Sequence, residues 1–181
     1  MVRYNWKKQD SHKKYKMMQT VSEVDVVQHF GVWNGTLISK KIAAGLFACG
    51  IPFVQIKELE QWQAKNALLI LPPDVGPLPG IPQQVRYLLL PDGMQPVIRA
   101  DCAVSYGLSG RDSITVSSLG ENTMAISLQR ELVTVSGHVL ERQELLLPQI
   151  SDLSAEETLA VYGALLLLDA APSDLTKCRL E

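Results

Sequence analysis

The stretch VDVVQHFGVWNGTLISKKIAAGLFACG (residues 24–50) contains the pattern that decides the fold. Residues 24–32 are rich in β-branched and aromatic side chains, which predicts a strand. Beyond the next turn, apolar side chains recur at helical spacing until Gly50, which stands where many helices end in a left-handed residue. These side chains are Leu37, Ile38, Ile42, Leu46 and Phe47. A strand that passes through a short turn into a helix is the first half of a β-α-β unit.

The same alternation continues for another forty residues. IPFVQI (51–56) predicts a second strand, KELEQWQAKN (57–66) a short helix, and ALLIL (67–71) a strand of the apolar kind that parallel sheets bury. A proline-rich connection (72–84) then leads to a fourth strand (85–90). The sequence therefore predicts an α/β fold with an open, mainly parallel, Rossmann-like sheet in three layers.

The second half of the chain has a different pattern. Apolar and polar side chains alternate with a period of two, which is typical of half-buried antiparallel strands, and we expect an antiparallel section after Ser105. Ser154 and Glu157 fit a capping box at the start of a C-terminal helix that runs through residues 165–168. The strand candidates cover residues 101–107, 113–119, 123–130, 131–137 and 143–148.

Charge divides the chain into two parts. The 181 residues have a net charge of −2, which argues against a chain-wide nucleic-acid-binding surface. Residues 1–20 carry a net charge of +5, so the remainder carries −7. We expect a basic, flexible arm (1–20) and a single α/β domain (21–181). The arm is either solvated or makes weak contacts with a nucleic acid or an anionic surface, although Trp6 and Tyr15 could pack on the domain.

Cysteine usage and hydropathy indicate a cytoplasmic protein. Cys49, Cys102 and Cys178 are widely spaced and form no C-x-x-C pair, so we expect free thiols and no structural zinc. No apolar segment follows the basic start, and nothing suggests export. The longest apolar run is interrupted by Asp169 and is too short to cross a bilayer, so no membrane contact is expected.

The turn after the first predicted strand is the best candidate for a binding site. Glycines between a strand and a helix let backbone N–H groups converge on an anion at the helix N-terminus. A phosphate loop ends in G-K-[ST], but here Thr36 follows Gly35 and the lysines come more than a helical turn later. We therefore expect weak phosphate or nucleotide binding without hydrolysis, or else a plain turn. The candidate residues are Gly31, Asn34, Gly35, Thr36, Ser39 and Lys40.

Other catalytic patterns are missing. The sequence has neither the dinucleotide-binding G-x-G-x-x-G nor the G-x-S-x-G nucleophile elbow. Its histidines are scattered, and Cys102 lies in an apolar strand where a buried, inert thiol is expected. Asp74 and Asp92 follow predicted strands, where α/β sheets place ligands, but solvated loop carboxylates are the default interpretation. No metal and no cofactor are expected. The histidines are His12, His29 and His138.

Three segments carry a family resemblance. GVWNGTLISKKIAAGLFACGIPF (31–53) resembles the loop and helix that begin the central domain of the Mur ligases and folylpolyglutamate synthases. Ser-Tyr-Gly (105–107) is similar to that family's T-[FY]-G motif, with the following strand at 112–118. ISDLSAEETLAVYGALLLLDAAPSDL (150–175) is similar to its next helix, and the three segments occur in the family's order.

The chain departs from that family where the family's chemistry lies. The loop lysine is absent, the metal-binding Glu and His have no match, about 70 residues separate Gly35 from Tyr106, and no C-terminal ligase domain is recognisable. The resemblance implies a shortened Mur-ligase-like scaffold that has lost ATP-dependent amide ligation. The leading hypothesis is a non-enzymatic protein that binds an anionic, nucleotide-like or cell-wall-precursor-like small molecule, or a protein partner. One alternative is a ligase subunit that needs a partner chain, and another is an interaction module that docks through its basic arm.

Overall fold

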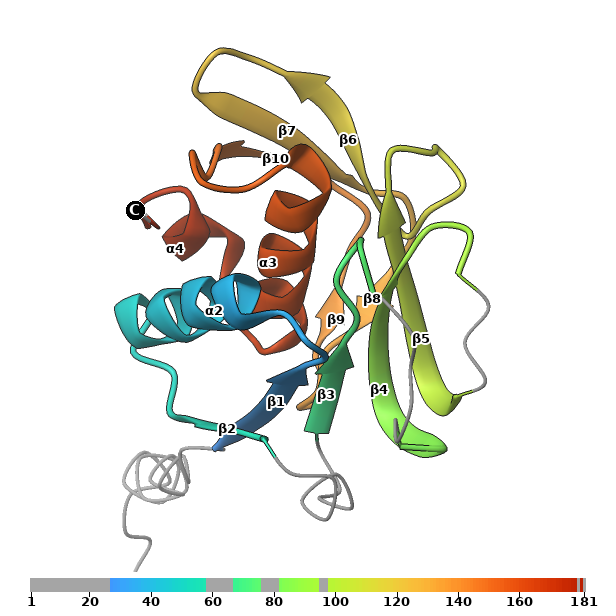
Figure 1. The fold of residues 1–181 in the computed structure, drawn as a ribbon. Coiled ribbons are helices and arrows are strands. Elements are labelled where there is room, and N and C mark those ends of the chain that lie inside the picture. Colours follow the sequence, from blue (N-terminus) through green and yellow to red (C-terminus); the bar gives the residue numbers. More distant parts are fainter. Residues whose placement is uncertain (1–26, 58–66, 76–81, 95–97, 179, 181) are drawn as a thin grey trace, which may run out of the picture.

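The computed structural model describes residues 27–57, 67–75, 82–94, 98–178 and 180. Its main element is an eight-stranded sheet, with a separate two-stranded sheet and helices packed against it (Figure 1). The strand order is β10-β7-β6-β5-β4-β3-β1-β2. The predicted α/β class is confirmed.

The predicted β-α-β unit forms the first part of the sheet. Strand β1 (Gln28–Val32) leads into helix α2 (Thr36–Ala48), which returns the chain to β2 (Phe53–Gln55). Strand β1 lies between β2 and β3 (Ala67–Ile70) and is parallel to both. Strand β4 (Gln84–Pro91) follows, parallel to β3. The observed β1 begins at Gln28, while residues 24–26 and most of the helix predicted at 57–66 lie outside the described residues.

Strand β5 (Arg99–Gly107) extends the parallel part of the sheet. The alternating pattern groups residues 101–107 with the antiparallel strand candidates, and for this strand the prediction is wrong, because it pairs with β4 in parallel from Gln84 to Pro91. The alternation of side chains reports that one face is exposed, and it does not report the direction of the neighbouring strand. Strand β6 (Ile114–Leu119) is also parallel to β5, through two residue pairs only.

The antiparallel section begins after β6, as the sequence predicts. Strands β7 (Thr123–Leu128) and β10 (Glu144–Pro148) extend the sheet with antiparallel pairing. The predicted strand 131–137 is wrong in length, because only β8 (Leu132–Val133) forms and it pairs with β9 (Val139–Leu140) in the small second sheet. Gly137, with φ of 90°, lies in the turn between them and ends the extended run.

The described helices α2, α3 (Ala155–Leu167) and α4 (Pro172–Leu175) lie on one face of the sheet (Figure 1). The capping box predicted for α3 is present, with hydrogen bonds between Ser154 and Glu157 in both directions. None of these helices is long and apolar enough to cross a membrane. The helix predicted at 57–66, which would belong to a third layer, is not among the described elements.

Two clusters of apolar side chains stabilise the sheet. The larger one lies between the sheet and the helices, where Phe30, Leu89 and Tyr106 are buried together with nearly the whole of α3. The smaller one includes Leu69 and Leu88, whose side chains point to the opposite face. Of the apolar side chains that predict α2, Ile38, Ile42 and Leu46 are buried, whereas Leu37 and Phe47 are exposed.

Candidate functional site

The predicted anion-binding residues lie around the turn between β1 and α2, at the edge where the parallel strands end. Gly31 is buried within β1 and does not form part of the turn itself. Asn34 is exposed and has a left-handed backbone with φ of 53°, a conformation that asparagine adopts more readily than most residues. Gly35 comes next and precedes the first residue of the helix, the exposed Thr36. The structure therefore brings Asn34, Gly35 and Thr36 together.

Helix α2 begins without a side-chain cap. Its first backbone hydrogen bond runs from the N–H of Ser39 to the carbonyl of Gly35 at 2.9 Å. The N–H groups of residues 36–38 therefore have no partner inside the helix. A Cβ atom on Gly35 would come within 2.5 Å of Cγ1 of Val32, so a serine or aspartate cap does not fit there unless Val32 moves.

The other predicted site residues on α2 are engaged elsewhere or point to solvent. Ser39 is buried, and its hydroxyl accepts a hydrogen bond of 2.6 Å from Nε2 of Gln55 on β2. Lys40 is exposed, whereas the neighbouring Lys41 is buried and donates to the Leu180 carbonyl at 3.0 Å. Neither Ser39 nor Lys41 is free to complete a phosphate loop.

The same edge of the sheet carries several carboxylates. Asp74 and Asp92 are exposed just beyond β3 and β4, and Asp92 accepts a hydrogen bond of 2.7 Å from the N–H of Gly93. Asp112 is buried, and a Cβ atom on Gly107 would lie 2.7 Å from its Oδ2 and 2.8 Å from Cβ of Asp92. Asp92 and Asp112 therefore both pack against the end of β5.

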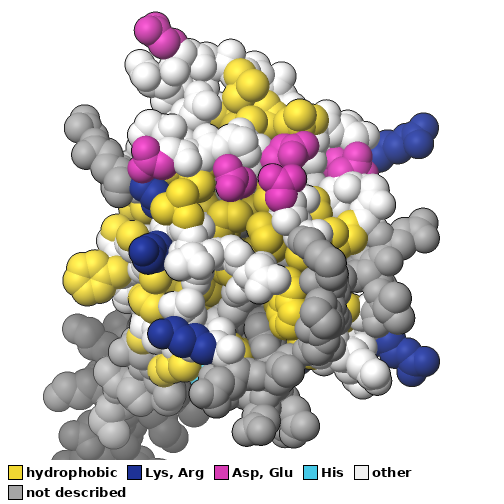
Figure 2. All heavy atoms as spheres, viewed as in Figure 1, with side chains coloured by type: hydrophobic (Ala, Val, Ile, Leu, Met, Phe, Trp, Pro, Cys, Tyr) yellow, Lys and Arg dark blue, Asp and Glu magenta, His cyan; other side chains and the backbone are white. Residues whose placement is uncertain are grey.

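Acidic side chains also gather over the region where α3 begins, on the face shown in Figure 2. Their field reaches Tyr106, whose hydroxyl donates to the Leu71 carbonyl at 2.7 Å. Burial first, and then the charges of Glu156, Glu157 and Asp74, raise the pKa of Tyr106 far above its ordinary value. The start of α2, whose first N–H groups have no partner within the helix, therefore lies at an edge that also carries negative charge.

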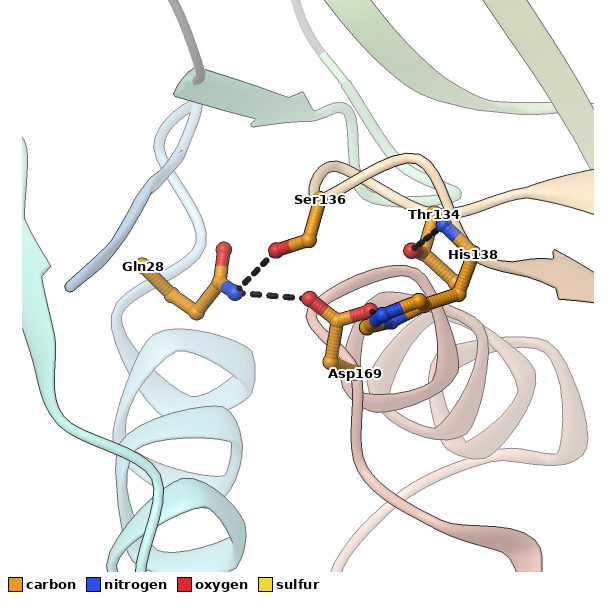
Figure 3. Close-up of polar contacts among 5 residues, drawn as sticks. All are labelled: Gln28, Thr134, Ser136, His138 and Asp169. Atoms are coloured by element: carbon orange, nitrogen blue, oxygen red, sulfur yellow. Dashed lines mark hydrogen bonds and ion pairs between the residues drawn. The ribbon is translucent and has the colours of Figure 1, made fainter. Parts of the chain in front are cut away.

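A second polar cluster lies at the opposite edge, where β1 begins (Figure 3). Nε2 of Gln28 donates to Oγ of Ser136 at 2.9 Å and to Oδ2 of Asp169 at 2.7 Å. The other Asp169 oxygen is 2.9 Å from Nδ1 of His138. The backbone N–H of His138 donates to Oγ1 of Thr134, which is buried in the same turn. These contacts join β1, the turn between β8 and β9, and the residues after α3.

The second cluster contains serine, histidine and aspartate, but its hydrogen bonds connect three parts of the fold and do not form a catalytic triad. Asp169 orients the His138 ring, whose side chain is 74% exposed. The hydroxyl of Ser136 is bonded to Gln28, and no hydrogen bond between Ser136 and His138 occurs in the described part of the chain. A nucleophile needs a base within hydrogen-bond reach, and Ser136 lacks that arrangement here.

The remaining candidates have ordinary surroundings. His29 is half-buried in β1, with Nδ1 3.0 Å from the Val27 carbonyl, and His12 lies outside the described residues. Within the described ranges, His, Cys, Asp and Glu side chains form no group of three that could hold a metal ion. Cys102 is half-buried in β5, where burial raises the pKa of its thiol.

The structure brings together one pair of residues that the sequence did not connect. Sγ of Cys49 lies 3.7 Å from Sγ of Cys178, although 129 positions separate them along the chain. Both are free thiols. Burial first, and then the hydrogen bond with Cys178, raise the pKa of Cys49 to about 12. No local spacing signal could have identified this pair, because the contact depends on the packing of α2 against the C-terminal segment.

Comparison with known proteins adds no relative: no protein-family model matches the chain, and no curated protein has a significant match to its sequence.

Proposed function

We propose that this chain is a non-enzymatic binding protein whose ligand contacts the edge of the sheet at the start of α2. The observation that carries the proposal is the uncapped start of α2, where the N–H groups of residues 36–38 have no partner within the helix and a capping residue at Gly35 would require Val32 to move. In the same turn, the indole Nε1 of Trp33 is buried and has no hydrogen-bond partner among the described residues. Ligands in open α/β sheets bind at this edge.

The charge around the turn favours a ligand with a small negative charge, of about one or two units. The positive end of the helix dipole attracts an anion, and N–H donors bind its oxygen atoms. Pro72 lies beside the turn, since its Cβ is 3.7 Å from where a Cβ on Gly35 would be. Asp74 follows two residues later, so its negative charge repels a highly charged ligand at the turn. A carboxylate or a phosphate monoester therefore suits the turn better than a triphosphate. The Mur-ligase resemblance adds cell-wall precursors as candidate ligands.

The contacts of Ser39 and Lys41 argue against the ligase alternative. Phosphoryl transfer needs cationic groups that stabilise the charge on the transferred phosphate. Lys41 is bonded to the Leu180 carbonyl, and Lys40, the only other lysine of α2, follows Gly35 by five positions. We therefore expect no nucleotide turnover. Docking through the basic arm remains a separate hypothesis that concerns residues outside the described ranges.

Amide NMR titrations with acetate, inorganic phosphate and magnesium ATP test this proposal. We expect chemical-shift changes at residues 36–38, and no phosphate release from ATP. The variant Asp74→Asn should tighten phosphate binding by about two- to fivefold, because it removes a nearby negative charge. Asp101→Asn is the matched control, since Asp101 is exposed near the start of β5, at the opposite edge, and the charge change is the same.

Two results would count against the proposal. If residues 36–38 show no shift with any of the three anions, the turn is only a connection between β1 and α2. If the chain releases phosphate from ATP and Lys40→Ala abolishes the release, the enzyme alternative is correct.

A further inference from the structure

Helix α2 and the C-terminal segment hold two thiols in contact. Cys49 immediately follows α2, and its backbone N–H donates to the Gly45 carbonyl at 2.9 Å. Cys178 follows α4, is only 8% exposed, and donates its backbone N–H to the Asp174 carbonyl at 3.1 Å. The Sγ atoms are 3.7 Å apart, whereas a disulfide bond is about 2.05 Å long. The two thiols are therefore in contact, and bond formation requires the sulfur atoms to move closer by less than about 2 Å.

A second contact fixes the position of the C-terminal segment beside α2. Lys41, two turns before Cys49 on the same helix, donates to the carbonyl of Leu180, two residues beyond Cys178. Because Lys41 is buried, this bond is protected from competition with water. The backbone hydrogen bonds of the two cysteines and the bond from Lys41 to Leu180 therefore hold Cys178 beside Cys49. This gives the two thiols a high effective concentration for each other.

We propose that Cys49 and Cys178 are an oxidation site, at which a peroxide or a disulfide reagent converts the two thiols into an intramolecular disulfide that ties α2 to the C-terminal segment. The two cysteines are 129 positions apart in the sequence, so a disulfide between them would close a long loop and reduce the conformational entropy of the unfolded chain. This inference does not depend on the proposed anion site.

Hydrogen peroxide oxidises the two thiols in two steps. The sulfur of Cys49, the more exposed of the two, attacks one peroxide oxygen, the O–O bond breaks, and the departing hydroxide takes up a proton to become water. Cys49 is then a sulfenic acid. The sulfur of Cys178 attacks the sulfur of Cys49, an S–S bond forms, the S–O bond breaks, and the leaving hydroxide takes the Cys178 proton. Two thiols and one peroxide give one disulfide and two waters.

The reaction should be slow at neutral pH. The thiolate is the reactive form, and burial raises the pKa of Cys49 to about 12, so few molecules carry the thiolate at pH 7. The rate should rise with pH for as long as the protein remains folded. This chemistry suits a stabilising bond formed in an oxidising environment better than a rapid sensor.

The test uses the full-length protein, oxidised with hydrogen peroxide or diamide, alkylated, digested without reduction and analysed by mass spectrometry. We expect a linked peptide pair containing Cys49 and Cys178 that is two hydrogen atoms lighter than the reduced peptides. The melting temperature should rise by roughly 5 to 10 °C on oxidation and return to its original value with dithiothreitol. Cys102→Ser should leave both results unchanged.

Two variants keep the test decisive. Cys49→Ser, at the less buried position, should remain folded while losing both the linked peptide and the rise in melting temperature. Cys178→Ala should give the same result, but it alters a more buried side chain. The proposal is overturned if Cys49 is oxidised to sulfinic acid without a linked peptide, if linkages to Cys102 are as abundant, or if only intermolecular dimers form.

Discussion

At the scale of single residues, the neighbouring lysines Lys40 and Lys41 show how differently one helix can use the same side chain. Lys40 is exposed, whereas Lys41 is buried and bonded to the Leu180 carbonyl. Asp152 is 3.4 Å from the Lys41 amine, but its side chain is 66% exposed, so this ion pair adds little. The hydrogen bond to the buried carbonyl is the contact that matters.

Substituting the two lysines one at a time should change the free energy of unfolding by different amounts. Lys41→Ala should lower the free energy of unfolding by about 1 to 3 kcal/mol, because it leaves the Leu180 carbonyl without its donor and removes a buried alkyl chain. Lys40→Ala should change it by no more than about 0.5 kcal/mol. Urea unfolding followed by circular dichroism measures both values. Equal effects would mean that the C-terminal segment is not held by Lys41.

The raised pKa of Tyr106 should make the stability of the protein fall at alkaline pH. Its folded-state pKa is raised, chiefly by burial, so the folded state keeps the proton when the unfolded state begins to lose it near pH 10. Stability should therefore be unaffected by this group below that pH and should fall as the pH rises above it. Burial also raises the pKa of Tyr162, which adds to the same fall.

The variant Tyr106→Phe checks this assignment. At neutral pH it should destabilise the protein by about 1 to 3 kcal/mol, because the buried Leu71 carbonyl loses its donor. Above pH 10 its stability should fall less steeply than that of the wild type, with Tyr162 providing the remaining slope. Urea midpoints measured between pH 8 and pH 11 give both slopes. Parallel curves would show that Tyr106 does not titrate differently in the two states.

At the scale of secondary-structure elements, the contact between α2 and α3 depends on a residue without a side chain. A Cβ atom on Gly45 would lie 2.7 and 2.8 Å from the two terminal carbons of Leu165. Gly45 and Leu165 are both buried. The glycine therefore permits the helices to approach, although glycine in a helix interior lowers intrinsic helix stability.

Gly45→Ala should destabilise the protein by about 1 to 3 kcal/mol, despite the better helix propensity of alanine, because the fully buried Leu165 side chain would have to shift within the core. Leu165→Ala should also destabilise it, by about 2 to 5 kcal/mol, through the cavity it leaves. The double variant should be more stable than the sum of the two effects predicts, since each change relieves the other. Strict additivity in chemical unfolding would contradict a direct contact between these positions.

The elements that could be predicted are those whose signals are local. The capping box of α3 spans four residues, and the β-α-β unit follows from the period of its apolar side chains. The parallel direction of β5 could not be predicted, because its alternating side chains are the same whichever way the neighbouring strand runs. The turn containing Gly137 could be recognised, but not how few residues on each side of it would pair.

At the scale of the whole molecule, the side-chain contacts that sequence reasoning missed join distant parts of the chain. Cys49 meets Cys178, and Gln28 meets Asp169 across 141 positions. The C-terminal segment takes part in the first contact, and the second residue beyond α3 takes part in the second. Asp169 seemed only to interrupt an apolar run, but it holds a left-handed backbone, with φ of 69°, at the point where α3 turns into the final segment. Such contacts follow from the packed structure and leave no periodic signal.

The uneven distribution of charge leads to the last prediction, which concerns residues 1–18. These residues lie outside the described ranges, and their composition buries little apolar surface, so their removal should shift the melting temperature by less than about 1 °C. Removing their net positive charge should also make the remaining, acidic domain elute earlier from a cation exchanger. Differential scanning calorimetry of the truncated and full-length proteins provides the measurement. A loss of several degrees would show that the arm stabilises the domain, and Trp6→Ala and Tyr15→Ala in the full-length chain would then identify which aromatic side chain anchors it.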